Sequence, residues 1–263
     1  MKEVAFDPKE YYASYPTRVI LRPGYPARAQ YKSTLMWDLY GKYIIRELGQ
    51  VNTYADIGGC FGFGANAMAF HISNVQGTYP NTMLFEISSD FITIGKRLFP
   101  YIDFVLGDFG EWNGTPKIFD LVTLFDLIEH VSNPETFLSN VAVRTRLALL
   151  ITPMETTGEW RGSKPPPNRG KDHPDGHVNF FTPKSYRFLL EKSNLEIVDS
   201  RLVRTIAPPG ARRILFPGNS SNRPTMKSLI ITAATQIVPY KFLRKVLTGG
   251  HFLCLARSKK TMK

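Results

Sequence analysis

The chain has 263 residues, of which 43% are hydrophobic and 21% are charged. This composition can build a hydrophobic core, which excludes a wholly disordered chain. Two cysteines exclude a disulfide framework and a four-cysteine zinc site. The longest apolar stretch, residues 228–238, is shorter than the roughly 20 residues of a membrane span, and residues 1–7 do not resemble a signal peptide. We therefore expect a cytoplasmic protein.

The positive charge is concentrated in the last quarter of the chain. The formal net charge is +11, yet residues 1–200 contain 20 basic and 22 acidic residues, and residues 201–263 contain 13 basic residues and no acidic one. A one-sided field of this kind attracts phosphates, acidic lipid headgroups or nucleic acid. It is compatible with association at the inner face of a membrane, and equally with a solvated basic surface that has no partner.

Strands and helices are predicted to alternate along the chain. The first fifty residues form a helical lead-in or cap, because residues 31–48 carry apolar residues at helical spacing. Beyond it we predict strands at 51–57, 82–87, 102–106, 119–124, 147–152, 195–204 and 251–256, and helices at 65–72, 90–98, 134–143 and 182–192. This alternation predicts one α/β domain over residues 51–263, with a mostly parallel sheet between helical layers.

Two segments interrupt the alternation. Residues 155–180 are polar and rich in proline, and we interpret them as a loop over the substrate. Residues 208–250 interleave basic and apolar residues, which fits either a cap over a substrate pocket or an amphipathic surface that rests on an anionic membrane. No nucleic-acid-binding motif is recognisable, so nucleic acid is an unfavoured partner.

The turn after the first strand points to a nucleotide cofactor. Glycines there let the backbone approach a ligand closely, and Glu86, which closes the second strand, can accept hydrogen bonds from ribose hydroxyls. From Gly62 to Ala67 the sequence satisfies the dinucleotide pattern G-x-G-x-x-A, which would indicate an NAD-dependent oxidoreductase. From Asp56 it is D-x-G-x-x-x-G. We prefer the second pattern because Gly62 lies five residues beyond the strand end at Ile57.

This second pattern resembles motif I of the class I S-adenosylmethionine-dependent methyltransferases. The resemblance extends from about residue 54 to residue 195, through Gly-Asp-Phe at 107–109, FDLVTLFDLIEHV at 119–131 and HVNFFT at 177–182, which are similar to segments of small-molecule methyltransferases. It implies a doubly wound seven-stranded sheet with an antiparallel last strand, here carrying the insertion at 208–250, and S-adenosyl-L-methionine as cofactor.

The resemblance also implies roles for individual residues. Asp56 would orient the glycine turn and face the amino-acid end of the cofactor. The other expected cofactor-binding residues are Gly58, Cys60 and Gly62 for methionine and ribose, Glu86 for ribose, Asp108 and Phe109 for adenine, and Phe125 and Asp126 at the sulfonium.

The expected reaction is in-line methyl transfer to an oxygen of a small molecule or sugar, including a lipid-linked one. Positioning lowers the barrier, and a hydroxyl nucleophile gains from a general base. The candidates for the base are His130 and His177, ahead of His173 and Glu129. A non-catalytic cofactor-binding protein at a membrane surface is a further alternative.

A metal site is the minority hypothesis, and the preferred interpretation assigns no metal ligand. Asp126, Glu129 and His130 are spaced i, i+3, i+4, which on a helical turn places all three on one face. His177 could then complete a site for a divalent ion.

Overall fold

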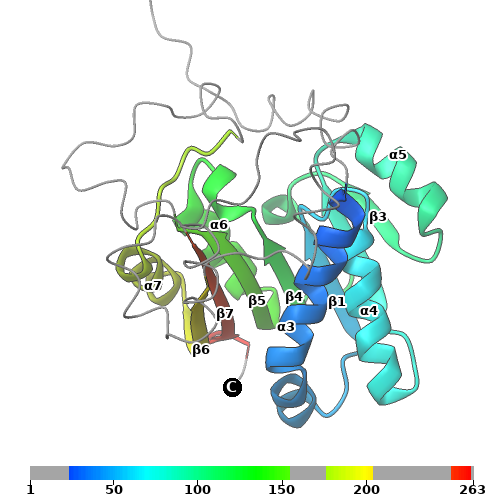
Figure 1. Ribbon diagram of the computed structural model, residues 1–263, viewed down its shortest axis with the longest axis horizontal. Helices are drawn as coiled ribbons and strands as arrows, with labels where there is room; N and C mark the ends of the chain where they lie inside the picture. The colour runs from blue at the N-terminus through cyan, green and yellow to red at the C-terminus, as the bar shows by residue number, and fades with distance from the viewer. Residues whose placement is uncertain (1–23, 155–175, 204–249, 262–263) are drawn as a thin grey trace, which may run out of the picture.

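A seven-stranded sheet lies between two layers of helices (Figure 1). The computed structural model describes residues 24–154, 176–203 and 250–261. The strands are β1 (Thr53–Ile57), β2 (Asn81–Glu86), β3 (Asp103–Leu106), β4 (Phe119–Phe125), β5 (Thr145–Pro153), β6 (Leu195–Val203) and β7 (His251–Ser258). Their order is β3-β2-β1-β4-β5-β7-β6, and β7 runs in the direction opposite to the other six of these strands. The predicted mostly parallel sheet with an antiparallel last strand is confirmed.

The helices cover both faces of the sheet. They are α3 (Tyr25–Leu48), α4 (Phe63–Gln76), α5 (Ser89–Leu98), α6 (Pro134–Ala142) and α7 (Pro183–Lys192), with two short 3₁₀ helices, η1 (Phe109–Glu111) and η2 (Ile128–His130). Helix α3 begins six residues before the predicted start, because Gly24 adopts a left-handed N-cap and a proline occupies the first turn. Helix α7 begins as predicted, with a capping box between Thr182 and Ser185.

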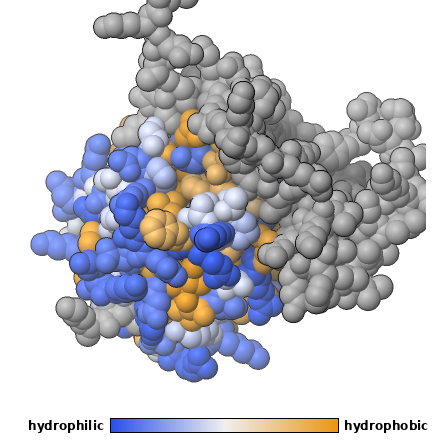
Figure 2. All heavy atoms as spheres, turned by 90° about the vertical axis from the view of Figure 1, so that its left-hand side faces the viewer, coloured by the Kyte–Doolittle hydropathy of each residue, from blue (hydrophilic) through white to orange (hydrophobic). Residues whose placement is uncertain are grey.

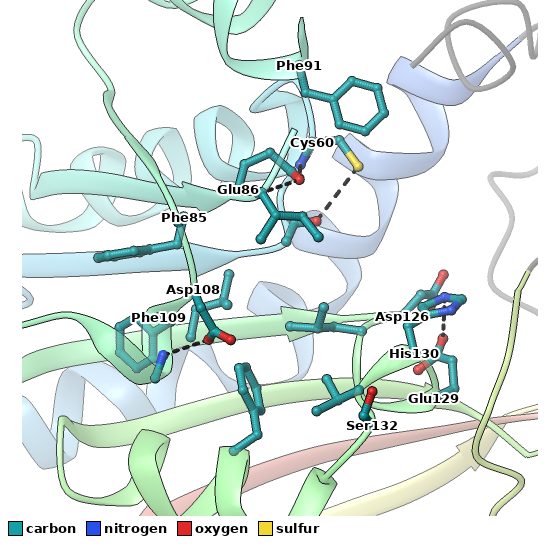
Figure 3. Close-up of a pocket in the computed structure, with 18 of the residues that line it drawn as sticks. Cys60, Phe85, Glu86, Phe91, Asp108, Phe109, Asp126, Glu129, His130 and Ser132 are labelled. Atoms are coloured by element: carbon teal, nitrogen blue, oxygen red, sulfur yellow. Dashed lines mark hydrogen bonds and ion pairs between the residues drawn. The ribbon is translucent and has the colours of Figure 1, made fainter. Parts of the chain in front are cut away.

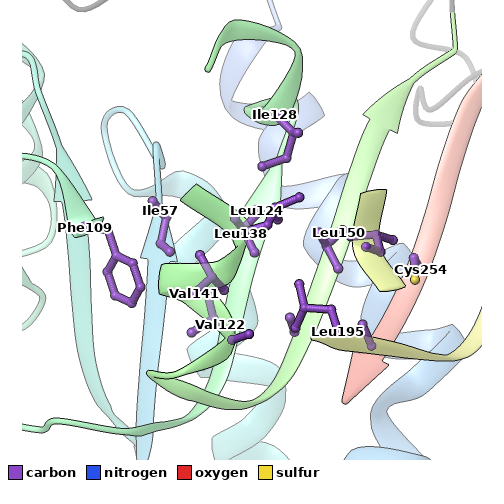
Figure 4. Close-up of a cluster of buried hydrophobic side chains, with 14 of the residues drawn as sticks. Ile57, Phe109, Val122, Leu124, Ile128, Leu138, Val141, Leu150, Leu195 and Cys254 are labelled. Carbon is purple, nitrogen blue, oxygen red and sulfur yellow. The ribbon is translucent and has the colours of Figure 1, made fainter. Parts of the chain in front are cut away.

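Two buried clusters hold the helical layers to the sheet. One joins α3, α4 and α5 to one face, through residues such as Met36, Met68 and Leu121. The other joins α6 and α7 to the opposite face, through residues such as Leu190 and, in Figure 4, Leu138. Because the central strands are buried on both faces, their sequences are nearly continuous apolar runs. This explains why they could be predicted from composition.

The sheet order reverses between β1 and β4. From β1 the chain proceeds outward through β2 and β3, and it then crosses to β4 on the other side of β1. In open α/β sheets a ligand binds beyond the carboxyl ends of the strands at such a reversal. The loops after β1, β2, β3 and β4 are therefore the place for a site.

The side of the molecule that carries α7 has a mostly hydrophilic surface with apolar side chains in its middle (Figure 2). Phe188 of α7 is the most exposed large hydrophobic residue of the described chain, at 66%. Within the described ranges, no helix is both long and apolar enough to cross a membrane. The predicted substrate loop up to residue 175 and the predicted insertion up to residue 249 lie outside the described residues.

Candidate active site

A cavity of about 770 Å³ opens at the carboxyl ends of β1 to β4 (Figure 3). Cys60 and Glu86 lie on one side of it, and Asp126, Glu129 and His130 lie on another. The cavity volume falls within the range of about 300–1,000 Å³ that is typical of small-ligand pockets. One cavity therefore joins most of the residues that the sequence singled out.

The glycine turn forms the floor of the cavity between β1 and α4. Gly58 has φ +72°, and a Cβ there would lie 2.9 Å from Leu127 Cδ1, so this position favours glycine. Cys60 also has a positive φ, of 51°, and its side chain lines the cavity. Gly62 instead is the left-handed N-cap of α4 and is absent from the cavity wall as described.

Glu86 at the end of β2 fastens this turn to the next one. Its Oε2 accepts a hydrogen bond from Cys60 N at 3.1 Å, and its Oε1 accepts from Ile87 N at 2.8 Å and Ser88 N at 3.0 Å. Burial raises the pKa of Glu86, and these three N–H groups counteract part of that rise. A carboxylate has about four acceptor sites, so one remains for a ligand hydroxyl.

Asp56 lies beneath the turn, and the cavity wall of the described chain does not include it. Its Oδ1 accepts a hydrogen bond from Thr123 Oγ1 at 2.6 Å, and a Cβ on Gly59 would approach its Oδ2 to 2.3 Å. Burial raises the pKa of Asp56 to about 6, against a usual 3.8. The carboxylate is thus placed to support the turn from below.

The loop after β3 forms the third wall. Asp108 Oδ1 accepts a hydrogen bond from Gly110 N at 2.8 Å and so caps η1. Phe109 is 1% exposed, and its ring packs edge-on against Phe85 at 4.9 Å between centroids. Both residues line the cavity, although most of the Phe109 ring belongs to the core.

Asp126, directly after β4, pairs with a lysine from the N-terminal helix. Lys32 Nζ donates to its Oδ2. Burial alone raises the pKa of Asp126, but the Lys32 ammonium, together with His251 and His130, outweighs it, and the pKa lies below its usual value. The neighbouring Phe125 packs with the α3–α4 cluster and is not among the cavity-lining residues of the described chain.

Glu129, His130 and His177 meet at the same end of the cavity. One ligand atom from each lies within 4.8 Å of the others, and the two imidazole centroids are 4.8 Å apart. Asp126 is not part of this group, contrary to the helical spacing of the metal hypothesis. In this segment only residues 128–130 are helical, and Asp126 precedes them with a left-handed φ of 50°, so the i, i+3, i+4 relation of a helix does not apply to it.

Helix α3 and strand β7 also contribute residues to the cavity, and these residues were not predicted from the sequence. Tyr25, Arg28 and Lys32 line the cavity from α3, and His251 lines it from the start of β7. A signal for Lys32 was present, because it precedes Met36, Tyr40 and Ile44 at intervals of four residues on the buried stripe of the helix. A lysine on such a stripe usually has a partner.

The cavity fits a cationic cofactor better than a dinucleotide. Asp126 Oδ1 is buried and has no hydrogen-bond partner among the residues described here, so it can accept a bond from an ammonium group. The Cys60 N–H is already donated to Glu86. The cavity wall as described carries more acidic than basic side chains: Glu86, Asp108, Glu111, Asp126 and Glu129 against Arg28 and Lys32. These charges favour a sulfonium and repel a pyrophosphate.

Comparison with known proteins agrees with this electrostatic argument. Residues 56–200 match the sequence model of a family described as a methyltransferase domain. No curated protein sequence matched the chain. The fold and the cavity define an α/β enzyme that binds its cofactor at the ends of the parallel strands. The chain belongs to the S-adenosylmethionine-dependent methyltransferases.

Solved structures share this fold at low identity. The [4+2]-cyclase SpnF has a TM-score of 0.55 and 14% identity, over 84% of this chain and 80% of its own. The N-terminal domain of EvdMO1 with S-adenosylhomocysteine bound has a TM-score of 0.51 and 12% identity, over 86% and 81%. An S-adenosylmethionine-dependent methyltransferase from Clostridium acetobutylicum has a TM-score of 0.51 and 11% identity, over 85% and 91%. Because a cyclase shares the fold, the acceptor must be argued from the site.

Proposed function

We propose that the enzyme transfers a methyl group to an oxygen of a small molecule or sugar. The observation that carries this proposal is the Glu129–His130–His177 group at the cavity end that also holds Asp126. An alcohol is a weak nucleophile at neutral pH, and it gains from nearby groups that favour loss of its proton. The role of this group is to activate the hydroxyl.

When bound, S-adenosylmethionine supplies an electrophilic methyl group. On the proposed assignment, the remaining acceptor site of Glu86 holds the ribose, Asp108 and Phe109 border the adenine, and Asp126 accepts from the ammonium. Gly58 and Cys60 line the stretch between them. Asp56 and Gly62 act indirectly, by supporting the turn and starting α4, and Phe125 acts by packing behind Asp126.

Without a metal ion, an imidazole of the group takes the proton from the acceptor hydroxyl. His130 and His177 both line the cavity, and His130 Nε2 lies 3.8 Å from Glu129 Oε1, which stabilises a proton on that ring. Holding the oxygen, the methyl carbon and the leaving group in line lowers the barrier further. His173 lies outside the described residues.

A sugar acceptor is supported by one structural neighbour. The EvdMO1 domain has also been crystallised in the presence of S-adenosylhomocysteine and D-fucose. The basic residues between 201 and 263 favour a phosphorylated or lipid-linked acceptor, and an anionic membrane surface stays part of this proposal. We place the enzyme in the cytoplasm.

The test is an acceptor screen with methyl-labelled cofactor. Hydroxylated sugars, sugar phosphates and phenols are compared with primary amines and thiols of similar size, and products are identified by mass spectrometry and NMR. We expect label on an oxygen. Label on nitrogen or sulfur alone, with no hydroxyl methylated, would contradict the proposal while leaving the methyltransferase assignment intact.

A further inference from the structure

The Glu129–His130–His177 group has the composition of a metal site. It offers two imidazole nitrogens and one carboxylate, all within 4.8 Å of one another. Glu129 is 1% exposed and His177 is 7% exposed, and all three residues line the cavity. Two imidazoles and a carboxylate are a donor set that first-row divalent metals favour.

Backbone hydrogen bonds place the three side chains together. Val178 N and Asn179 N both donate to the Glu129 carbonyl oxygen, at 2.9 and 3.0 Å. The Asn179 side chain donates to Ile128 O at 3.2 Å and to Val131 O at 2.6 Å. The segment that carries His177 is thereby fixed to η2, although 47 positions separate His177 from His130 in the sequence. The group is therefore built by the fold and does not depend on mobile side chains alone.

We propose that Glu129, His130 and His177 bind one divalent first-row metal ion, such as Zn²⁺ or Mn²⁺, facing the acceptor. Bonds from such an ion to nitrogen or oxygen are about 2.0–2.2 Å long, so ligand atoms around it lie within about 4.4 Å of one another. Small rotations of these side chains would reduce the present spacing of up to 4.8 Å to this limit. Three protein ligands leave coordination positions open toward the cavity, as in catalytic metal sites.

The catalytic role of this ion rests on the proposed function, and there it replaces the imidazole base. A divalent cation that coordinates the acceptor oxygen lowers the pKa of the hydroxyl, so the proton leaves to water in the cavity. The oxygen then uses a lone pair to form the bond to the methyl carbon, and the pair of the breaking carbon–sulfur bond stays on sulfur. His130 and His177 serve as neutral ligands and not as proton acceptors.

Metal binding is measured without reference to activity. Full-length protein with no histidine tag is treated with chelator, desalted and titrated with Mn²⁺ by electron paramagnetic resonance, and with Zn²⁺ against a chromophoric chelator. Glu129→Gln and His177→Gln remove one ligand each. His71→Gln is the matched control, because His71 bonds to Thr34 and neither residue is among the described residues that line the cavity. Binding of S-adenosylhomocysteine reports whether each variant is folded.

We expect one equivalent of bound ion in the parent protein and in His71→Gln, and at least about tenfold weaker binding in the two ligand variants. A second readout uses the unmodified protein, in case a variant fails to fold. Zn²⁺ should protect His130 and His177, but not His71, from diethyl pyrocarbonate, as mapped by mass spectrometry. Absence of saturable binding, or equal modification of His130 and His177 with and without Zn²⁺, would overturn the proposal.

The two proposals fail in different ways. If chelated protein methylates a hydroxyl at the full rate, the metal proposal is wrong in its catalytic role and the proposed function stands. If the ion binds as expected and only amines or thiols are methylated, the metal site stands and the proposed function is wrong.

Discussion

The two ends of the cavity are built in different ways. The cofactor end comes from consecutive turns after β1, β2 and β3, and its geometry is set by backbone groups, three of which donate to Glu86. The acceptor end joins α3, η2, the segment at 176–179 and the start of β7, which are far apart in the sequence. The cofactor end therefore uses the same kind of turn after three successive strands, whereas the acceptor end needs segments that only the complete fold brings together.

The two ends also differ in electrostatics. Asp56 at the cofactor end is a buried carboxylate with a raised pKa, because burial dominates and Glu86 adds a like charge. Asp126 at the acceptor end has a lowered pKa, because Lys32 is paired with it. A buried carboxylate without a nearby cation holds its proton more tightly, whereas a carboxylate paired with an ammonium group loses its proton more readily.

The largest effect expected from this difference is on the pH dependence of the free energy of unfolding, and it comes from Asp56. Because its folded pKa of about 6 exceeds the usual 3.8, the folded protein binds this proton more tightly than the unfolded chain does. The free energy of unfolding therefore falls as the pH rises between these two values. Two pKa units correspond to about 3 kcal/mol.

Asp56→Asn removes that titration while keeping an oxygen acceptor for Thr123. We expect the free energy of unfolding of the variant, relative to the parent, to increase by about 3 kcal/mol from about pH 4 to about pH 7, measured by urea denaturation. Asp38→Asn on the exposed side of α3 controls for loss of a negative charge. A pH-independent difference would show that Asp56 is not perturbed by burial.

The next largest effect is expected at Glu86. Glu86→Ala removes the proposed ribose ligand and leaves three backbone N–H groups without their acceptor. We expect S-adenosylhomocysteine to bind about 100-fold more weakly, measured by isothermal titration calorimetry. Glu135→Ala is the control, since Glu135 pairs with Lys192 on the surface. Unchanged affinity in Glu86→Ala would show that Glu86 does not bind the cofactor.

A smaller effect tests the acceptor end. Lys32→Met leaves Asp126 without its cation, and we expect a loss of about 2 kcal/mol in the free energy of unfolding. The full cost of a broken buried pair is not reached, because the Asp126 side chain is 33% exposed. The double variant Lys32→Met/Asp126→Asn should recover most of this loss in a urea titration. Lys42→Met on the exposed face of α3 is the control, and an equal loss there would contradict the pairing.

The smallest effect compares the two ends of α4. Gly62 and Gly77 both have a left-handed φ, of 91° and 80°. A Cβ on Gly62 would lie 3.1 Å from Phe104 Cζ, whereas one on Gly77 meets nothing within 4 Å. Gly77→Ala should cost about 1 kcal/mol for the backbone alone. Gly62→Ala should cost about 1 kcal/mol more, measured by thermal unfolding. Equal losses would show that Phe104 moves aside freely.

The cofactor end of the cavity could be predicted from the sequence better than the acceptor end. The strands were recognisable because they are buried on both faces, and Glu86 because an acid that ends a buried strand is unusual. The boundaries of α3 and α4 were less accurate, because α3 begins six residues earlier than predicted and α4 ends four residues later, and cap geometry depends on tertiary contacts. Lys32 and His251 could not be assigned to the cavity, because no local pattern tells which distant strand end a helix faces. Nor could the sequence show that Asp126 stays outside the group formed by Glu129 and the two histidines, because this depends on the left-handed backbone of Asp126 itself.

The position of β7 has a consequence for the synthesis of the protein. This strand, the last of the described ones in sequence, lies between β5 and β6 and pairs with both along most of its length. In a nascent chain that has not yet released residues 251–258 from the ribosome, β5 and β6 therefore each lack their β7 partner, and unpaired strand edges promote aggregation. Since His251 belongs to the same strand, the acceptor end of the cavity gains this residue in the same step that joins β6 to the rest of the sheet.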